Sequence, residues 1–154
     1  TVRSRGARDA AFWLSPAGAV LMAKRDSNWT RLFDSMLVAD ARGSRIRLTR
    51  GEPGFATLRA WLPAAMRGNE MQRRAAVLVV AGLNVVSEAV DGDATIADPV
   101  QHDWPQIRAL LGRGSVALAR GNPDADRYTA VIEMLNANAA TITPARPAGC
   151  GKPF

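Results

Sequence analysis

The stretch EMQRRAAVLVVAGLNVVSEAV, residues 70–90, decides how much of this chain is helical. Its small and apolar residues recur in alternating steps of four and three: Met71, Ala75, Leu78, Gly82, Val85 and Ala89. Such spacing places one apolar stripe along an α-helix, and the segment is longer than a typical strand. It therefore predicts a helix. The alternative is a buried strand, because AAVLVV is apolar on both faces and rich in valine.

The residues before this stretch also predict a helix. An apolar stripe at helical spacing is formed by Phe55, Leu58, Leu62 and Ala65. Trp61 lies beside this stripe. A proline removes a backbone hydrogen bond and clashes with the preceding turn. Pro63 is therefore expected to kink or end the helix.

Two further helices are predicted after the stretch. The first begins at Asp103, whose side chain can cap it, and ends just before Gly112. The segment SVALARG, residues 115–121, is then expected to return as a strand. The second helix opens at Asn122 and Pro123, and the positive end of its dipole favours the two aspartates that follow. Its apolar stripe consists of Tyr128, Val131, Ile132 and Leu135.

The first third of the chain predicts β-structure. Two apolar runs separated by SPAG, residues 15–18, indicate a hairpin over residues 12–23. A second hairpin is predicted over residues 36–49, with its turn at residues 40–44. Because side chains on a strand alternate between its faces, the second strand is expected to be half-buried with a basic outer face. Its inward residues are Ile46 and Leu48, and its outward residues are Arg45, Arg47 and Thr49.

Together these elements predict an α+β fold, with a small antiparallel β layer in the N-terminal half packed against three or four helices in the C-terminal half. A single domain would occupy residues 11–140. Residues 1–10 hold three arginines and few apolar side chains, and are expected to form a basic N-terminal arm. Residues 141–154 hold three prolines and two glycines, and are expected to form an extended C-terminal tail.

Composition excludes several classes of protein and site. The longest apolar run, residues 75–83, is far shorter than the roughly 20 residues that a membrane-spanning helix needs. The only cysteine, Cys150, has no partner for an internal disulfide, and with the only histidine, His102, it cannot complete a zinc site of the usual Cys/His type. The GCGKPF end lacks the hydroxyl residue and the helix of a nucleotide-binding loop. No cofactor or metal is therefore expected.

Positive charge is concentrated in one half of the sequence. Residues 1–74 hold 14 basic and 6 acidic side chains, whereas residues 75–154 hold 6 basic and 8 acidic ones. The first half is therefore expected to contain the surface that an anionic partner would contact. The candidate binding residues are Arg42, Arg45, Arg47, Arg50, Trp29, Arg31 and Arg59.

An acidic loop provides the alternative of catalysis. It gathers Asp91, Asp93, Asp98, His102 and Asp103. Carboxylates beside an imidazole can hold a divalent cation or transfer protons. However, the loop lacks the glycine and terminal glutamate of an EF-hand, and aspartates in such loops commonly form turns. No catalytic residue is assigned, and a small hydrolase-type enzyme that uses this loop is kept as an alternative.

These features favour a non-catalytic binding or assembly module of a larger complex. Its arginines and N-terminal arm would dock on an acidic protein surface or on further copies of the chain. The second alternative is a nucleic-acid-binding accessory protein, in which the same arginines contact phosphates and the tryptophans stack on bases. The third is that the arginines are only the solvated side of a hairpin.

Overall fold

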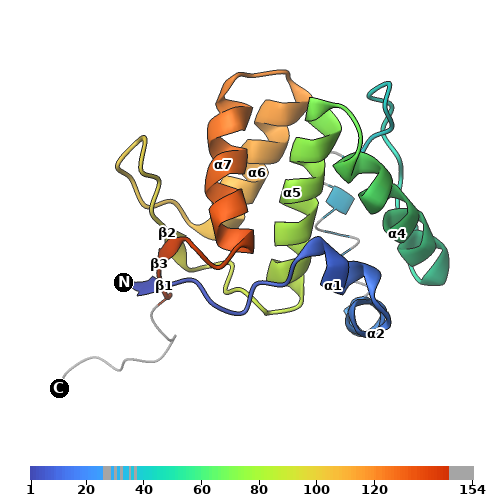
Figure 1. The fold of residues 1–154 in the computed structure, drawn as a ribbon, viewed down its shortest axis with the longest axis horizontal. Helices are drawn as coiled ribbons and strands as arrows, with labels where there is room; N and C mark the ends of the chain where they lie inside the picture. Colours follow the sequence, from blue (N-terminus) through green and yellow to red (C-terminus); the bar gives the residue numbers. More distant parts are fainter. Residues whose placement is uncertain (26–28, 30, 32, 35, 37, 146–154) are drawn as a thin grey trace.

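A computed structural model describes residues 1–145 of the chain apart from 26–28, 30, 32, 35 and 37. Figure 1 shows α5, α6 and α7 packed next to one another, α4, α1 and α2 on the other side of α5, and the short strands near one end of α7. The predicted α+β class is confirmed. The elements are β1 (Val2–Arg3), α1 (Ala10–Leu14), α2 (Pro16–Lys24), α4 (Glu52–Met66), α5 (Glu70–Val86), β2 (Thr95–Ile96), α6 (Ile107–Ala119), α7 (Asp124–Asn136) and β3 (Thr141–Thr143).

The central helix α5 confirms the helical interpretation of residues 70–90. A capping box starts it, in which the Asn69 side chain accepts from the Gln72 amide and the Gln72 side chain accepts from the Asn69 amide. It ends at Val86, before the end of the predicted range. Glu88 adopts a positive φ of 62°, which a right-handed helix cannot accommodate. Most of α5 is buried, so its valines serve a core helix and not a strand.

Helix α6 differs from the prediction at both ends. It begins at Ile107 instead of Asp103, and it continues through Gly112 to Ala119. The strand expected over residues 115–121 is therefore wrong. The reason is packing: Gly114 lies against Leu78 of α5 and Cβ of Tyr128 of α7, where an added Cβ would be 3.1 and 3.3 Å away. Gly114 permits this close approach of α5, α6 and α7, and Gly112 does not end α6.

The predicted helices on either side of α5 and α6 are present. The helix opening after Pro123 is confirmed as α7, which has both aspartates in its first turn. The helix of residues 55–65 is confirmed as α4, and Pro63 lies inside it without ending it. Its last turn is held by the burial of Leu62 and Ala65 in the core.

The hairpin predicted over residues 12–23 is wrong, because this segment forms α1 and α2. Asp9 caps α1 by accepting from the Phe12 amide. Ser15 ends α1 and caps α2, its Oγ accepting from the Gly18 amide, and Pro16 occupies the first turn. A serine followed by proline is a helix start as well as turn chemistry, and here burial of Trp13 selects the helices.

The three strands come from the two ends and the middle of the chain, not from the N-terminal half alone. They form one antiparallel sheet in the order β1-β3-β2, in which Ile142 pairs with both Val2 and Ile96. Ile96 is fully buried and ties the sheet to the core. Each strand is two or three residues long, too short to produce a periodic sequence pattern.

The N-terminal segment is not a loose arm. After β1, the Ser4 amide donates to Ala140 O at 2.8 Å. The Arg8 amide donates to Asn84 Oδ1 at 2.8 Å, and the Asn84 side chain donates back to Arg8 O at 3.0 Å. Two-way bonds of this kind hold residues 2–8 along the body of the protein. Of the predicted C-terminal tail, β3 belongs to the sheet, and residues 146–154 lie outside the part that the structure describes.

The second predicted hairpin is present in reduced form. Asp40 turns the chain by accepting from the Arg42 and Ser44 amides, and Ala39 pairs with Arg45 in a single bridge. The Ile46 amide also donates to Val38 O at 2.8 Å, but residues 46–49 do not belong to a strand. The expected alternation of burial is nevertheless present: Ile46 and Leu48 pack half-buried against the core.

One hydrophobic cluster joins residues from Trp13 to Ala140. Its largest fully buried side chains come from nearly every helix, so the helices share one interior. Within the described ranges, no helix is long and apolar enough to cross a membrane.

Candidate functional site

The arginine segment, residues 42–50, lies on the surface as the sequence predicted for its outward side chains. Arg42, Arg45, Arg47 and Arg50 are all exposed. Arg45 is held in place, because its Nη2 donates to Asp34 O at 2.6 Å and to Met36 O at 3.0 Å. The guanidinium groups of the other three make no ion pair or hydrogen bond with the described part of the chain.

The two remaining candidate arginines differ from each other. Arg59 is half-buried on α4, and its Nη2 donates to Leu14 O at 3.2 Å. This bond attaches α4 to the end of α1, which is a structural role. Arg31 is exposed.

Trp29 is a core residue and does not belong to a surface site. Its side chain is 0% exposed, and its ring lies 4.8 Å from that of Phe55 and 6.2 Å from that of Phe33. Trp61 is also buried, and its Nε1 donates to Ala39 O at 2.7 Å. Neither ring presents a face on which a base can stack. Trp61 attaches Ala39, just before the turn, to α4, and Trp29 packs against Phe55 of α4.

Four arginines elsewhere in the chain form ion pairs with carboxylates. The ion pairs are Arg25 with Glu88, Arg74 with Glu70 and Asp126, Arg108 with Asp93, and Arg127 with Asp98. By contrast, residues 40–67 contain six arginines against two carboxylates. The arginine segment is therefore a local excess of positive charge.

Carboxylates of the acidic loop accept hydrogen bonds from backbone amides of the same loop. Asp98 is 2% exposed, and its Oδ1 accepts from the amides of Val100 and Gln101 at 2.9 and 3.2 Å. Its Oδ2 lies 3.4 Å from Nε of Arg127. Asp91 Oδ1 accepts from the Asp93 amide at 3.0 Å. Across the described residues, no three His, Cys, Asp or Glu side chains are grouped so that they could hold a metal ion.

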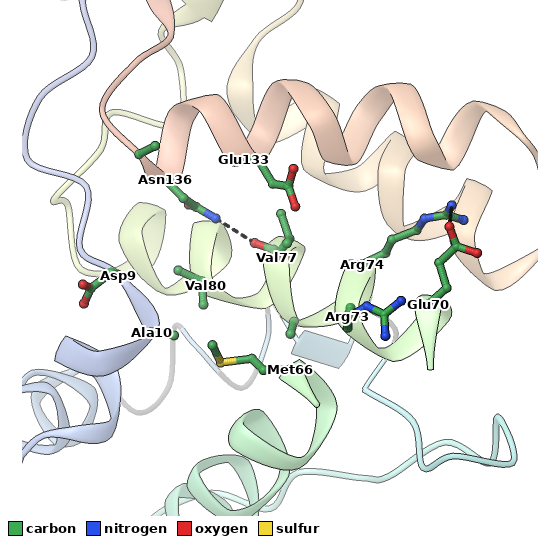
Figure 2. Close-up of a pocket in the computed structure, with 12 residues that line it drawn as sticks. Asp9, Ala10, Met66, Glu70, Arg73, Arg74, Val77, Val80, Glu133 and Asn136 are labelled. Atoms are coloured by element: carbon green, nitrogen blue, oxygen red, sulfur yellow. Dashed lines mark hydrogen bonds and ion pairs between the residues drawn. The ribbon is translucent and has the colours of Figure 1, made fainter. Parts of the chain in front are cut away.

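A second surface feature is a groove along α5, which we call the α5 groove. It has a volume of about 570 Å³ and is bordered by α1 and the end of α4 on one side and by α7 on the other. Figure 2 shows Val77 and Val80 of α5 at its centre. Asn136 of α7 donates to Val77 O at 3.0 Å, which holds α7 against α5 at the edge of the groove.

The charged residues of the α5 groove fall into two groups. Arg74 is paired with Glu70 and Asp126 at one end. Figure 2 shows Asp9 at the other end of the groove and Glu133 on the α7 border, beside Val77 near the middle. The Glu133 side chain makes no hydrogen bond or ion pair with any described residue. Its carboxylate is therefore not neutralised by the described part of the chain, and Arg73, near Arg74, bonds only to a carbonyl oxygen and keeps its positive charge.

Sequence reasoning did not predict the α5 groove. Val77 and Val80 lie off the apolar stripe that predicted the helix, and they were visible only as the extra hydrophobicity of AAVLVV. A helix that is apolar on more than one side must be covered on more than one side. Neighbouring helices cover α5 incompletely, and only the packing of α1 and α7 against α5 shows where that cover ends.

The protein thus presents two surfaces of different chemistry. The arginine segment offers guanidinium groups for anions, and the α5 groove offers an apolar floor beside the Glu133 carboxylate, which has no partner among the described residues. We infer function from these surfaces alone, because no protein-family model, curated protein or solved structure matches the chain.

Proposed function

We propose that this protein is a non-catalytic binding or assembly module that docks on an acidic protein surface through the arginine segment. The observation that carries the proposal is the state of Arg42, Arg47 and Arg50, which are exposed and have no partner in the described part of the chain. A guanidinium group is planar and bonds a carboxylate through two parallel N–H groups. Three such groups on one short segment fit a surface rich in Asp and Glu.

The local structure supports a preformed docking surface. The Asp40 turn, the Ala39–Arg45 bridge and the two bonds from Arg45 hold the backbone of the segment. Ile46 and Leu48 anchor it to the core. Binding therefore loses less conformational entropy than it would with a free loop.

Burial of the tryptophans favours a protein partner over a single-stranded nucleic acid. Single-strand grooves combine cations with aromatic rings on which bases stack. Trp29 and Trp61 are both interior, so the arginine segment has cations without such a platform among the described residues. Arg3 and Arg5 of the N-terminal segment are exposed, but that segment is held in the sheet region. It adds charge and not a flexible contact.

The test compares elution size and mass of the purified full-length chain at moderate salt, with and without nuclease. An assembly that survives nuclease treatment and is lost in Arg47→Ala/Arg50→Ala would support the proposal. The matched control is Arg113→Ala/Arg120→Ala, which removes two exposed arginines from α6 and the residue after it. This control should leave the assembly intact.

Three results would count against the proposal. Loss of the assembly on nuclease treatment would assign the arginines to nucleic acid. Equal loss in the two double variants would show that only total charge matters. A chain that elutes as a monomer is then titrated with poly-glutamate as an acidic probe, and equal affinity of wild type and Arg47→Ala/Arg50→Ala would count against the arginine segment.

A further inference from the structure

We propose that the α5 groove binds a basic amphipathic helix of a partner protein. The first observation is an apolar strip that is only partly covered. Its floor consists of Ala76 and Val80, which are buried, and Val77, which is half-buried, and Met66 stands at its edge with 45% of its surface exposed. An exposed apolar side chain beside a concave apolar floor is a feature of grooves that bind a helix. This surface is separate from the arginine segment, so the proposal does not depend on it.

The shape of the groove fits a helix. It follows α5 from Glu70 to Val80, which corresponds to about 15 Å at the helical rise of 1.5 Å per residue. That length accommodates about three turns of a second helix. α7 borders one side, and α1 with the end of α4 borders the other, so the occupant would lie between helices in the manner of helix-in-groove recognition.

The charges select a basic occupant. At one end of the groove Arg74 is paired with Glu70 and Asp126, and Arg73 donates to the neutral Gly68 O at 2.7 Å and keeps its positive charge. Away from that end, the Glu133 side chain has no partner within the described residues, and Asp9 has one carboxylate oxygen, Oδ1, engaged by the Phe12 amide. A Lys or Arg side chain can lay its aliphatic part on Val80 and reach these carboxylates with its charged end.

The test uses the full-length chain and two labelled helical peptides of about twelve residues. Both carry leucines at positions i, i+3, i+4 and i+7, and their flanking charges are all Lys in one and all Glu in the other. Fluorescence anisotropy should show saturable binding of the Lys peptide, with the Glu peptide at least about tenfold weaker. Glu133→Arg should weaken the Lys peptide about tenfold and strengthen the Glu peptide, because the charge is reversed at one position.

A second pair of variants separates the groove from general surface hydrophobicity. Met66→Ala should weaken the Lys peptide, whereas Met134→Ala, at a similarly exposed methionine of α7 outside the groove, should not. No saturable binding of the Lys peptide would overturn the proposal, as would equal binding of both peptides or an unchanged affinity in Glu133→Arg. Self-association of the chain that is lost in Met66→Ala would also overturn it, since the occupant would then be a second copy.

Discussion

The corner between α1 and α2 can be tested with two glycine-to-alanine substitutions, Gly18→Ala in α2 and Gly112→Ala in α6. Alanine is the better helix former by up to about 1 kcal/mol at each position. The surroundings differ sharply. At Gly18 an added Cβ would lie 2.4 Å from Phe12 O and 2.7 Å from Trp13 Cα, whereas at Gly112 nothing lies within 4 Å.

The expected changes in stability have opposite signs. The atoms that meet the new methyl group at Gly18 belong to the backbone of α1, so relief requires the two helices to separate. Overpacking costs about 1–3 kcal/mol, and a backbone clash lies at the upper end. After the gain in helix propensity, Gly18→Ala should destabilise the protein by about 2 kcal/mol. Gly112→Ala should stabilise it by up to about 1 kcal/mol.

Thermal unfolding followed by circular dichroism measures both effects. For a chain of this size, 1 kcal/mol shifts the Tm by about 2–4 °C. Gly18→Ala should therefore lower the Tm by about 4–8 °C, and Gly112→Ala should raise it by up to about 4 °C. A Tm of Gly18→Ala equal to or above that of wild type would show that α1 and α2 do not meet at this corner.

Three further substitutions test the interior and the surface. Asn84→Ala should lower the free energy of unfolding by about 2 kcal/mol, because it removes two hydrogen bonds to the Arg8 backbone. Hydrogen exchange of residues 5–9 should also accelerate, and unchanged exchange would contradict the attachment of this segment. Trp61→Phe should lower the free energy of unfolding, measured in urea, by about 2 kcal/mol, because the buried carbonyl of Ala39 loses its donor and the core loses volume. A change near zero would contradict this contact. Trp104→Phe should remove most of the acrylamide-quenchable fluorescence, because Trp104 is 45% exposed while the other three tryptophans are buried. A quenchable fraction that persists in this variant would place another tryptophan at the surface.

Several elements were determined by local sequence. Helix α7 has its proline, its acidic first turn and its apolar stripe within fifteen residues. For α5, the spacing of the apolar residues and the length of the segment both favour a helix. The inward turn of Ile46 and Leu48 also follows from neighbouring residues. Such features are readable because each depends on contacts and preferences that repeat every two to four positions.

The errors arose where one signal has two local meanings. Ser15 and Pro16 are typical of both a turn and a helix start, and burial of Trp13 decided for the helices. Glycine at position 112 is typical of a helix end, yet α6 continues past it because Gly114 allows α5 and α7 to approach. Local preferences of about 1 kcal/mol are smaller than the gain from burying a large side chain.

The candidate site shows the same division. The sequence located the arginine segment and its outward side chains, because charge and alternation are local properties. It did not distinguish Arg59, which bonds the end of α1, from Arg47, which is free of the described chain. It also placed Trp29 on the surface, although that ring completes the core beside Phe55.

The sequence by itself determined that the chain is a basic α+β protein with core helices at α5 and α7. Tertiary structure alone decided the sheet, in which Val2 meets Ile142 across nearly the whole chain, and the α5 groove, which lies where α1 and α7 fail to meet. Pairings between distant residues leave no periodic pattern, since each depends on how completed helices pack and not on the preferences of adjacent residues.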